Sequence, residues 1–289
     1  MSKKSHPSRN DPRAAMFPAD FGDLHKQVRE LLSDPTERSE RIGKGRKDPQ
    51  NPKGDQQYSF DRVTDQLIRR WIAVNFESGT ISSEECAGDF RFGQGSPRYR
   101  FIVDPVDGSD NFQRGLPLSA ISIAVLPHDA KVAVEQVCFA MVGGIEQSVP
   151  WVAARGQGAW QGKKRLRVSP VRRLREAFLS CELNHYEVGS PLAELLSRAR
   201  GVRSFGCASR AIALVAQGAL DAHLDLRSRL TPESFLGAAL VLTEAGGCIR
   251  SADGTPIESF PSLLTRTTVV AAATTDLAEE IIHDLAQPT

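Results

Sequence analysis

The segment FIVDPVDGSDNF, from Phe101 to Phe112, places two carboxylates at the end of an apolar strand. The run Phe-Ile-Val delivers Asp104, and Pro105 lacks the N–H that a strand ladder needs, so we expect the strand to end there. Asp104 and Asp107 are three residues apart across the turn, which allows both carboxylates to point at one spot. Two like charges held this close are costly unless a cation lies between them. Hard oxygen ligands of this kind suit Mg²⁺, which pairs with a substrate phosphate.

The same segment offers groups that bind an anion and orient a water. The carbonyl of Val106 is a further ligand candidate for the metal, and Gly108 lets the backbone approach a ligand closely. If Gly108 and Ser109 open a helix, their N–H groups form a phosphate site, and the Ser109 hydroxyl is able to orient a water. The alternative interpretation is a capped turn in which both aspartates accept backbone N–H groups.

Carboxylates upstream weigh against that alternative. Glu84 and Glu85 form an acidic pair, Asp61 stands at the start of an expected helix, and Asp55 lies in the polar loop before it. Each of them alone is more typical of a solvated carboxylate or a helix N-cap. Together they supply the several carboxylates that a two-metal phosphoryl-transfer site needs.

The bulk composition is that of an ordinary soluble globular protein. Of 289 residues 40% are hydrophobic and 25% charged, and no apolar stretch approaches the ~20 residues of a membrane span. The five cysteines are scattered without a C-x-x-C pair, and the charged N-terminus has no apolar run behind it. These features favour free thiols in the cytoplasm and no secretory signal. Any metal is therefore expected on oxygen ligands rather than on thiolates or histidines.

A net charge of +1 gives no global field for nucleic acid, so binding to it would need a local patch. The basic cluster Lys163–Arg175 is one candidate patch, and we interpret it instead as a solvated hairpin and linker. We therefore expect neither a nucleic-acid partner nor a membrane partner.

The chain is expected to divide into a tail and two halves. Residues 1–19 are rich in Lys, Arg, Ser, Asn and Pro, as a flexible tail is. Two amphipathic helices then precede short β-branched strands that start at Phe101, and strands alternate with helices in the second half. This order predicts an α/β protein with an α+β half over residues 20–170 and an α/β half over residues 171–289.

The motif DPVDGSDNF, with SSEE upstream and a helix ending in EAGG in the second half, resembles the signature of the inositol monophosphatase superfamily. That superfamily also contains fructose-1,6-bisphosphatases and 3′-phosphoadenosine phosphatases. The stretches GDQQYSFD and GALDAHLDLR are most similar to the archaeal-type members with both inositol monophosphatase and fructose-1,6-bisphosphatase activity. The resemblance runs over nearly the whole chain and implies a layered αβαβα sandwich and a homodimer.

The activity that this resemblance implies is Mg²⁺-dependent hydrolysis of a small phosphorylated metabolite. Inositol monophosphate, fructose 1,6-bisphosphate or both are the expected substrates, and 3′-phosphoadenosine 5′-phosphate is the alternative. About two to three Mg²⁺ ions are expected per site. Ser109 would help to activate the attacking water, Asp61 would orient it, and Asp55 would help to bring in a further ion. The ligands implied for the metal are Glu84, Asp104, Asp107 and the carbonyl of Val106.

The second half of the chain would complete the substrate pocket. Asp225 matches the acidic residue that meets substrate hydroxyls, and Arg227 beside it is a candidate for a second phosphate or a sugar hydroxyl. The other groups that the resemblance implies at the substrate are Gly108, Ser109, Gly206 and Cys207.

One position departs from the family pattern. Relatives carry an aspartate at the start of the helix that ends in EAGG, and Ser234 stands at that position here. A neutral hydroxyl is a weaker Mg²⁺ ligand than a carboxylate. Glu233 is adjacent, but a neighbouring helical residue points about 100° away. The departure motivates an alternative, a weakened or inactive member that binds a phosphorylated ligand or a protein partner.

Overall fold

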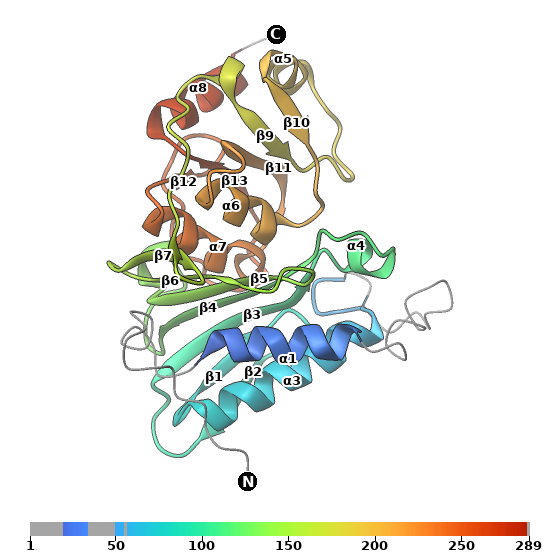
Figure 1. Cartoon of the computed structure of the whole chain (residues 1–289), viewed down its shortest axis with the longest axis vertical. Helices are drawn as coiled ribbons and strands as arrows, with labels where there is room; N and C mark the ends of the chain where they lie inside the picture. Colours follow the sequence, from blue (N-terminus) through green and yellow to red (C-terminus); the bar gives the residue numbers. More distant parts are fainter. Residues whose placement is uncertain (1–19, 34–49, 55–56, 288–289) are drawn as a thin grey trace.

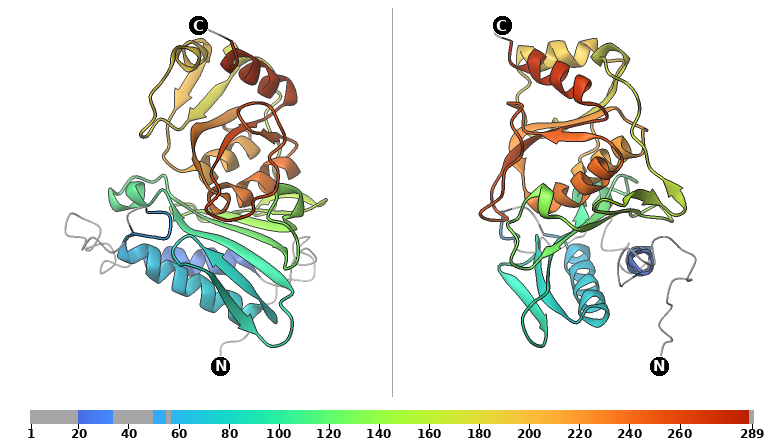
Figure 2. Two further views of the ribbon diagram at one scale, coloured as in Figure 1. Left: turned by 180° about the vertical axis from the view of Figure 1, so that it is seen from behind. Right: turned by 90° about the vertical axis from the view of Figure 1, so that its left-hand side faces the viewer.

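The computed structural model describes residues 20–33, 50–54 and 57–287, so the expected tail over residues 1–19 and the loop residue Asp55 lie outside the described residues. In the described part, the elements form five layers: a helix pair, an eight-stranded sheet, a helix pair, a five-stranded sheet and a helix pair (Figure 1). The views from behind and from the side show the same stacking (Figure 2). The expected αβαβα sandwich is confirmed.

The larger sheet has the strand order β2-β1-β3-β4-β5-β6-β7-β8. Its neighbouring strands are antiparallel, except that β1 and β3 run parallel to each other. The sequence analysis had not foreseen β1 and β2, because β1 contains only one large apolar residue, Ile81, and the alternation in β2 is limited to Phe90 and Phe92. The strands are β1 (Ser78–Ser83), β2 (Asp89–Gly93), β3 (Tyr99–Asp107), β4 (Ala120–Pro127), β5 (Phe139–Gly144), β6 (Trp151–Ala154), β7 (Gly158–Gln161) and β8 (Lys164–Arg165).

Helices α1 (Phe21–Ser33) and α3 (Ser59–Asn75) cover one face of this sheet (Figure 1). Successive side chains of a strand point to opposite faces, and β3 shows this directly. Phe101 and Val103 belong to the core beneath α1 and α3, whereas Ile102 belongs to the core on the other face. The apolar run of β3 is therefore continuous because both faces of the sheet are covered.

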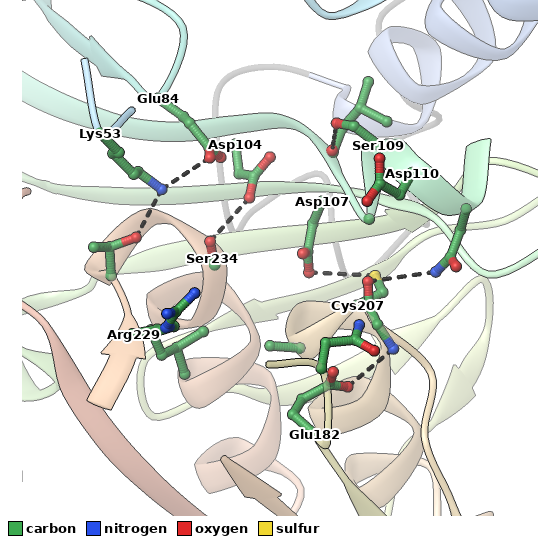
Figure 3. A pocket seen from close by; sticks show the side chains of 18 of the residues that line it. Lys53, Glu84, Asp104, Asp107, Ser109, Asp110, Glu182, Cys207, Arg229 and Ser234 are labelled. Atoms are coloured by element: carbon green, nitrogen blue, oxygen red, sulfur yellow. Dashed lines mark hydrogen bonds and ion pairs between the residues drawn. The ribbon is translucent and has the colours of Figure 1, made fainter. Parts of the chain in front are cut away.

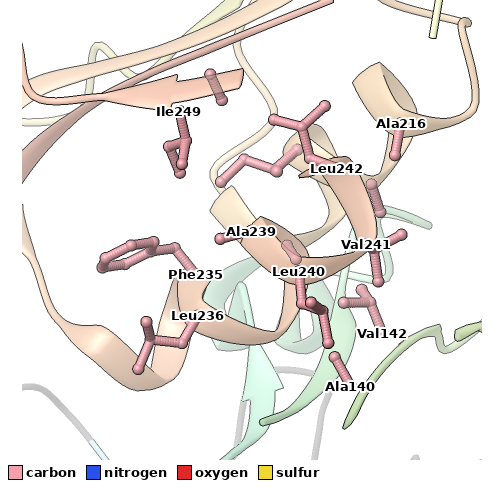
Figure 4. Packing of buried hydrophobic residues seen from close by; sticks show 14 of the residues in the cluster. Ala140, Val142, Ala216, Phe235, Leu236, Ala239, Leu240, Val241, Leu242 and Ile249 are labelled. Carbon is pink, nitrogen blue, oxygen red and sulfur yellow. The ribbon is translucent and has the colours of Figure 1, made fainter. Parts of the chain in front are cut away.

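Helices α6 (Ala208–Ala216) and α7 (Pro232–Glu244) lie between the two sheets. Every residue of α7 from 232 to 242 is buried, as expected of a helix enclosed on all sides. Figure 4 shows Leu240 pointing toward Ala140 of the larger sheet, and Leu242 lying on the side of Ile249. This one helix therefore joins the cores of both sheets.

The smaller sheet has the order β10-β9-β11-β13-β12, and its outer face packs against α5 (Ser190–Arg198) and α8 (Thr275–Leu285). Its strands are β9 (Phe178–Cys181), β10 (Gly201–Arg203), β11 (Ala222–Leu230), β12 (Cys248–Arg250) and β13 (Thr267–Ala272). The division of the chain at residue 170 stays a prediction. Within the described ranges, the helices are too short or too polar to cross a membrane.

The enclosed position of α7 predicts a large effect of truncating its core side chain. Leu240→Ala, at a fully buried position, should lower the free energy of unfolding by about 2–5 kcal/mol through lost burial and a residual cavity. The matched control is Leu264→Ala, whose side chain is 55% exposed and should change stability by about 0.5 kcal/mol or less. Urea unfolding of the two variants measures both values, and equal losses would contradict the packing of α7.

Candidate active site

A cavity of about 400 Å³ opens between the end of β3 and the segments of the second half that face it. This volume is typical of a small-molecule site. The predicted residues Asp61, Asp225 and Glu233 do not line it, since their side chains are buried behind its wall. The predicted residues that do line it are Glu84, Asp104, Val106, Asp107, Gly108, Ser109, Gly206, Cys207, Arg227 and Ser234.

A bulge in β3 brings two carboxylates to this cavity. Asp104 lies opposite Ser122 of β4 and Asp107 opposite Ala120, so three steps along β3 match two along β4. Without the extra residue, side chains three apart would point to opposite faces of the sheet. The expectation that β3 ends at Pro105 was wrong. The strand continues to Asp107, because a bulge leaves a residue unpaired and so tolerates a proline.

The parallel pairing of β1 and β3 places Glu84 beside Asp104. Ser83 lies opposite Val103, and the Glu84 N–H donates to the Val103 carbonyl at 3.1 Å. The residues that follow two parallel neighbours emerge at the same edge of a sheet. Glu84 and Asp104 therefore lie side by side although twenty residues separate them in the sequence, and Figure 3 shows both at one end of the cavity.

The three carboxylates repel one another where burial limits their contact with water. Burial raises the pKa of Asp104 well above its ordinary value, and Glu84 and Asp107 add to the shift. Burial also raises the pKa of Asp107, to about 6, although donors from α6 oppose the shift. At Glu84 burial is outweighed by a nearby lysine, Lys53, and the pKa lies below its ordinary value. The cluster therefore holds protons readily and is electrostatically suited to a cation.

The start of α6 holds Asp107 in place. The Ser209 N–H donates to Asp107 Oδ2 at 2.7 Å, and the Cys207 thiol lies 3.2 Å from the same oxygen. These are the first groups of a helix, where unpaired N–H donors and the helix dipole favour negative charge. The Gly206 N–H donates to Glu182 at 3.0 Å, so the loop before α6 is anchored as well. The sequence analysis did not identify Glu182, which stands in no motif.

Gly108 occupies a position that only glycine fits. It begins helix α4 (Ser109–Gln113) with φ at +80°, in the left-handed region. A Cβ there would lie 2.9 Å from the Gly206 carbonyl and 3.1 Å from Cys207 Cβ. The close approach of these two loops explains the glycine. A helix does open at Gly108 and Ser109, which is the condition that the sequence analysis set for a phosphate site, and the first N–H groups of a helix have no partner within it.

Ser109 links the cavity to a buried carboxyl. Its Oγ lies 2.9 Å from Asp61 Oδ1 and 2.8 Å from the Val106 carbonyl, and its single proton can be donated to one of them at a time. Asp61 Oδ2 accepts the Tyr58 N–H at 3.0 Å at the start of α3. Burial is the main cause that raises the pKa of Asp61 well above its usual range, and Glu85 adds to it.

Asp225 and Arg227 lie together on β11 and form a forked ion pair. Arg227 Nε lies 3.0 Å from Asp225 Oδ1, and its Nη2 lies 2.7 Å from Oδ2. Asp225 is fully buried, while Arg227 reaches the cavity wall. The carboxylate therefore orients the arginine. Two further cations that the sequence analysis missed, Arg229 and Arg266, line the same side of the cavity.

The α7 side of the cavity carries a lysine that the sequence analysis did not identify. Lys53 Nζ lies 2.9 Å from Glu84 Oε1 and forms an ion pair with Glu233. Burial alone would lower the pKa of Lys53, but these carboxylates raise it above its ordinary value. Ser234 does reach the site, and its hydroxyl donates to Asp104 Oδ2 at 3.1 Å (Figure 3). Lys53 stands in no motif that the sequence analysis used, so no signal in the sequence marked it.

The donor set suits a hard divalent cation. Asp104 Oδ1 is buried and has no hydrogen-bond partner in the described part of the chain. A buried oxygen of this kind is suited to be a metal ligand. Within residues 20–33, 50–54 and 57–287, no three His, Cys, Asp or Glu side chains form a ready-made metal cage. The carboxylates fit Mg²⁺ by their chemistry, because this ion prefers hard oxygen ligands.

Known proteins resemble this chain over most of its length. A fructose-1,6-bisphosphatase/inositol-1-monophosphatase of Thermococcus kodakarensis is 28% identical over 239 residues, 81% of this chain and 84% of the relative. Inositol monophosphatase 1 of Bos taurus is 26% identical over 78% of this chain and 79% of its own.

Two solved structures share the fold. The extragenic suppressor protein suhB of Bartonella henselae matches with a TM-score of 0.77 and 22% identity, covering 93% of this chain and 98% of its own. An IMPase of Thermotoga maritima matches with a TM-score of 0.73 and 23% identity, covering 92% and 94%. The model of the inositol monophosphatase family matches residues 23–288. With DPVDGSDNF at the cavity and this match over nearly the whole sequence, the chain belongs to the inositol monophosphatase family.

Proposed function

We propose that this chain is a Mg²⁺-dependent phosphatase of a small phosphorylated metabolite, with inositol monophosphate and fructose 1,6-bisphosphate as the favoured substrates. The observation that supports this most is the meeting of three carboxylates, one buried and two partly buried, with the opening of α4 at one cavity. Glu84, Asp104 and Asp107 suit a divalent cation, and the N–H groups at the start of α4 suit a phosphate. The printed names of the relatives support the same reaction class.

In this proposal each part of the site has a separate task. When bound, Mg²⁺ supplies positive charge and Lewis acidity for the phosphoryl group. Ser109 donates its proton toward Asp61, so the lone pairs of Oγ face the cavity and accept a hydrogen bond from a water there. Asp61 holds this hydroxyl in place and offers a carboxyl of raised pKa for the proton of that water.

The arginines opposite the carboxylates support a substrate with more than one polar group. Arg227, oriented by Asp225, lies on the same wall as Arg229 and Arg266. Guanidinium groups bind phosphate in a forked geometry and also donate to sugar hydroxyls. The cavity therefore suits a sugar or inositol phosphate and has room for a second phosphate. The expected homodimer, the cytoplasmic location and the role of Asp55 belong to the same proposal.

The first prediction is the reaction itself. Purified protein should release phosphate from inositol 1-phosphate or fructose 1,6-bisphosphate with Mg²⁺, and should lose this activity in excess chelator. A colorimetric phosphate assay measures it, with 3′-phosphoadenosine 5′-phosphate as the comparison substrate. If no phosphate is released from any of the three substrates at any Mg²⁺ concentration, the result would instead favour a non-catalytic family member that binds a phosphorylated ligand.

The second prediction concerns Ser109. Because its hydroxyl connects the cavity to Asp61, Ser109→Ala should lower kcat by roughly 10²–10⁴-fold, the usual range for losing proton-transfer assistance. Ser197→Ala, on the exposed outer helix α5, is the matched control and should keep the wild-type rate. If the Ser109→Ala variant has the same kcat as the control variant, Ser109 takes no part in the reaction.

The third prediction links metal binding to pH. Since the pKa values of Asp104 and Asp107 are raised, these carboxyls hold protons that a cation must displace. Mg²⁺ affinity should therefore fall as pH falls, by up to about tenfold per pH unit for each proton displaced. Calorimetry at pH 6 and pH 8, in buffers of different ionisation enthalpy, measures the affinity and the proton release. Equal affinities at both pH values would contradict the raised pKa values.

A further inference from the structure

Lys53 sits among oxygen atoms in the way a bound cation does. Its Nζ lies 2.9 Å from Glu84 Oε1 and 2.7 Å from Thr231 Oγ1, and it pairs with Glu233 Oε1. These three oxygens come from two distant parts of the chain, the end of β1 and the start of α7. Only 9% of the Lys53 side chain is exposed, so its ammonium has exchanged water for these oxygens.

Lys53 offsets the negative charge of two carboxylates, Glu84 and Glu233. Glu233 is 1% exposed, and its second oxygen has no hydrogen-bond partner among the described residues. A buried carboxylate without a partner destabilises the folded state several times more than an exposed carboxylate without one. Glu84 needs the same cation, because it lies against the carboxyl of Asp104. The ammonium is thus shared between the buried carboxylate of Glu233 and the partly buried carboxylate of Glu84, which would otherwise repel each other.

The adjacent residue of α7 offers no competing attraction for a metal ion. Ser234 Oγ donates to Asp104 Oδ2 at 3.1 Å, so Asp104 Oδ2 already has a neutral hydrogen-bond partner from the chain. A divalent ion on the α7 side would have to displace the ammonium from Glu84 and Glu233. The ion would then be coordinated by the Ser234 hydroxyl, which binds a divalent ion more weakly than a carboxylate does. Both charge and ligand type therefore favour the lysine there.

We propose that the ammonium of Lys53 is a resident cation of this site and takes the place of a second divalent ion on the α7 side. The chain then holds one divalent ion, among Glu84, Asp104 and Asp107. Lys53 and Ser234 act in the same direction: Lys53 adds a positive charge to the site, and Ser234 has no negative charge where a carboxylate was expected. This inference rests on the proposed function and deepens it, because it states which positive charges the site holds: one divalent ion and the ammonium of Lys53.

Counting bound ions tests the proposal without requiring turnover. The full chain is titrated with Mn²⁺, and the free ion is followed by electron paramagnetic resonance. Wild-type protein should bind one Mn²⁺ per chain. The double variant Lys53→Met/Ser234→Asp removes the ammonium, keeps most of the stem and adds a carboxylate, so it should bind two. Ser234→Asp alone should still bind one, because the ammonium remains.

Lys131→Met, at an exposed position, is the matched control and should keep the wild-type count. Two Mn²⁺ ions per wild-type chain would overturn the proposal, whether or not any variant folds. An unchanged count in a folded double variant, judged by circular dichroism, would also overturn it. The count is independent of phosphate release, so a protein that binds one ion and hydrolyses nothing would refute the proposed function and leave the role of Lys53 standing.

Discussion

Carboxylates that are held close together with little access to water are the constraint on which the site depends. The parallel pairing of β1 and β3 sets Glu84 beside Asp104, and the bulge in β3 turns Asp107 toward them. Desolvation and mutual repulsion make this arrangement costly for an isolated chain. A folded protein keeps such a cluster only when other groups offset the charge, and a cation is the most direct way to do so.

The surrounding elements are arranged to offset that charge. The first turn of α6 donates an N–H to Asp107, and Lys53 neutralises Glu84 together with Glu233. Both devices depend on the layered fold, because α6 and α7 are pressed against the larger sheet by the core that Leu240 helps to fill. Packing far from the cavity therefore decides how closely the charged groups meet, which connects the stability of the sandwich to the chemistry of its site.

Much of this arrangement was predictable, for identifiable reasons. The αβαβα sandwich followed from the resemblance, which rests on motifs spread along the chain. The oxygen ligands Asp104 and Asp107 followed from the local pattern, because they lie in one continuous segment. The end of β3 at Pro105 was predicted wrongly, since a bulge is a property of two paired strands. Lys53 was missed because its partners lie more than thirty residues away, just after β1 and at the start of α7, with no repeat or motif to link them.

By itself the sequence determined which chemical groups are present. DPVDGSDNF contains a glycine and a set of oxygen ligands in one short segment, and Ser234 reveals that one expected carboxylate is absent. Only the tertiary structure decided which charges share a space. The tertiary structure seats the ammonium of Lys53 between Glu84 and Glu233 and ties Arg227 to Asp225. The physical reason is that Coulomb interactions depend on separation and burial, and neither can be read from distance along the chain.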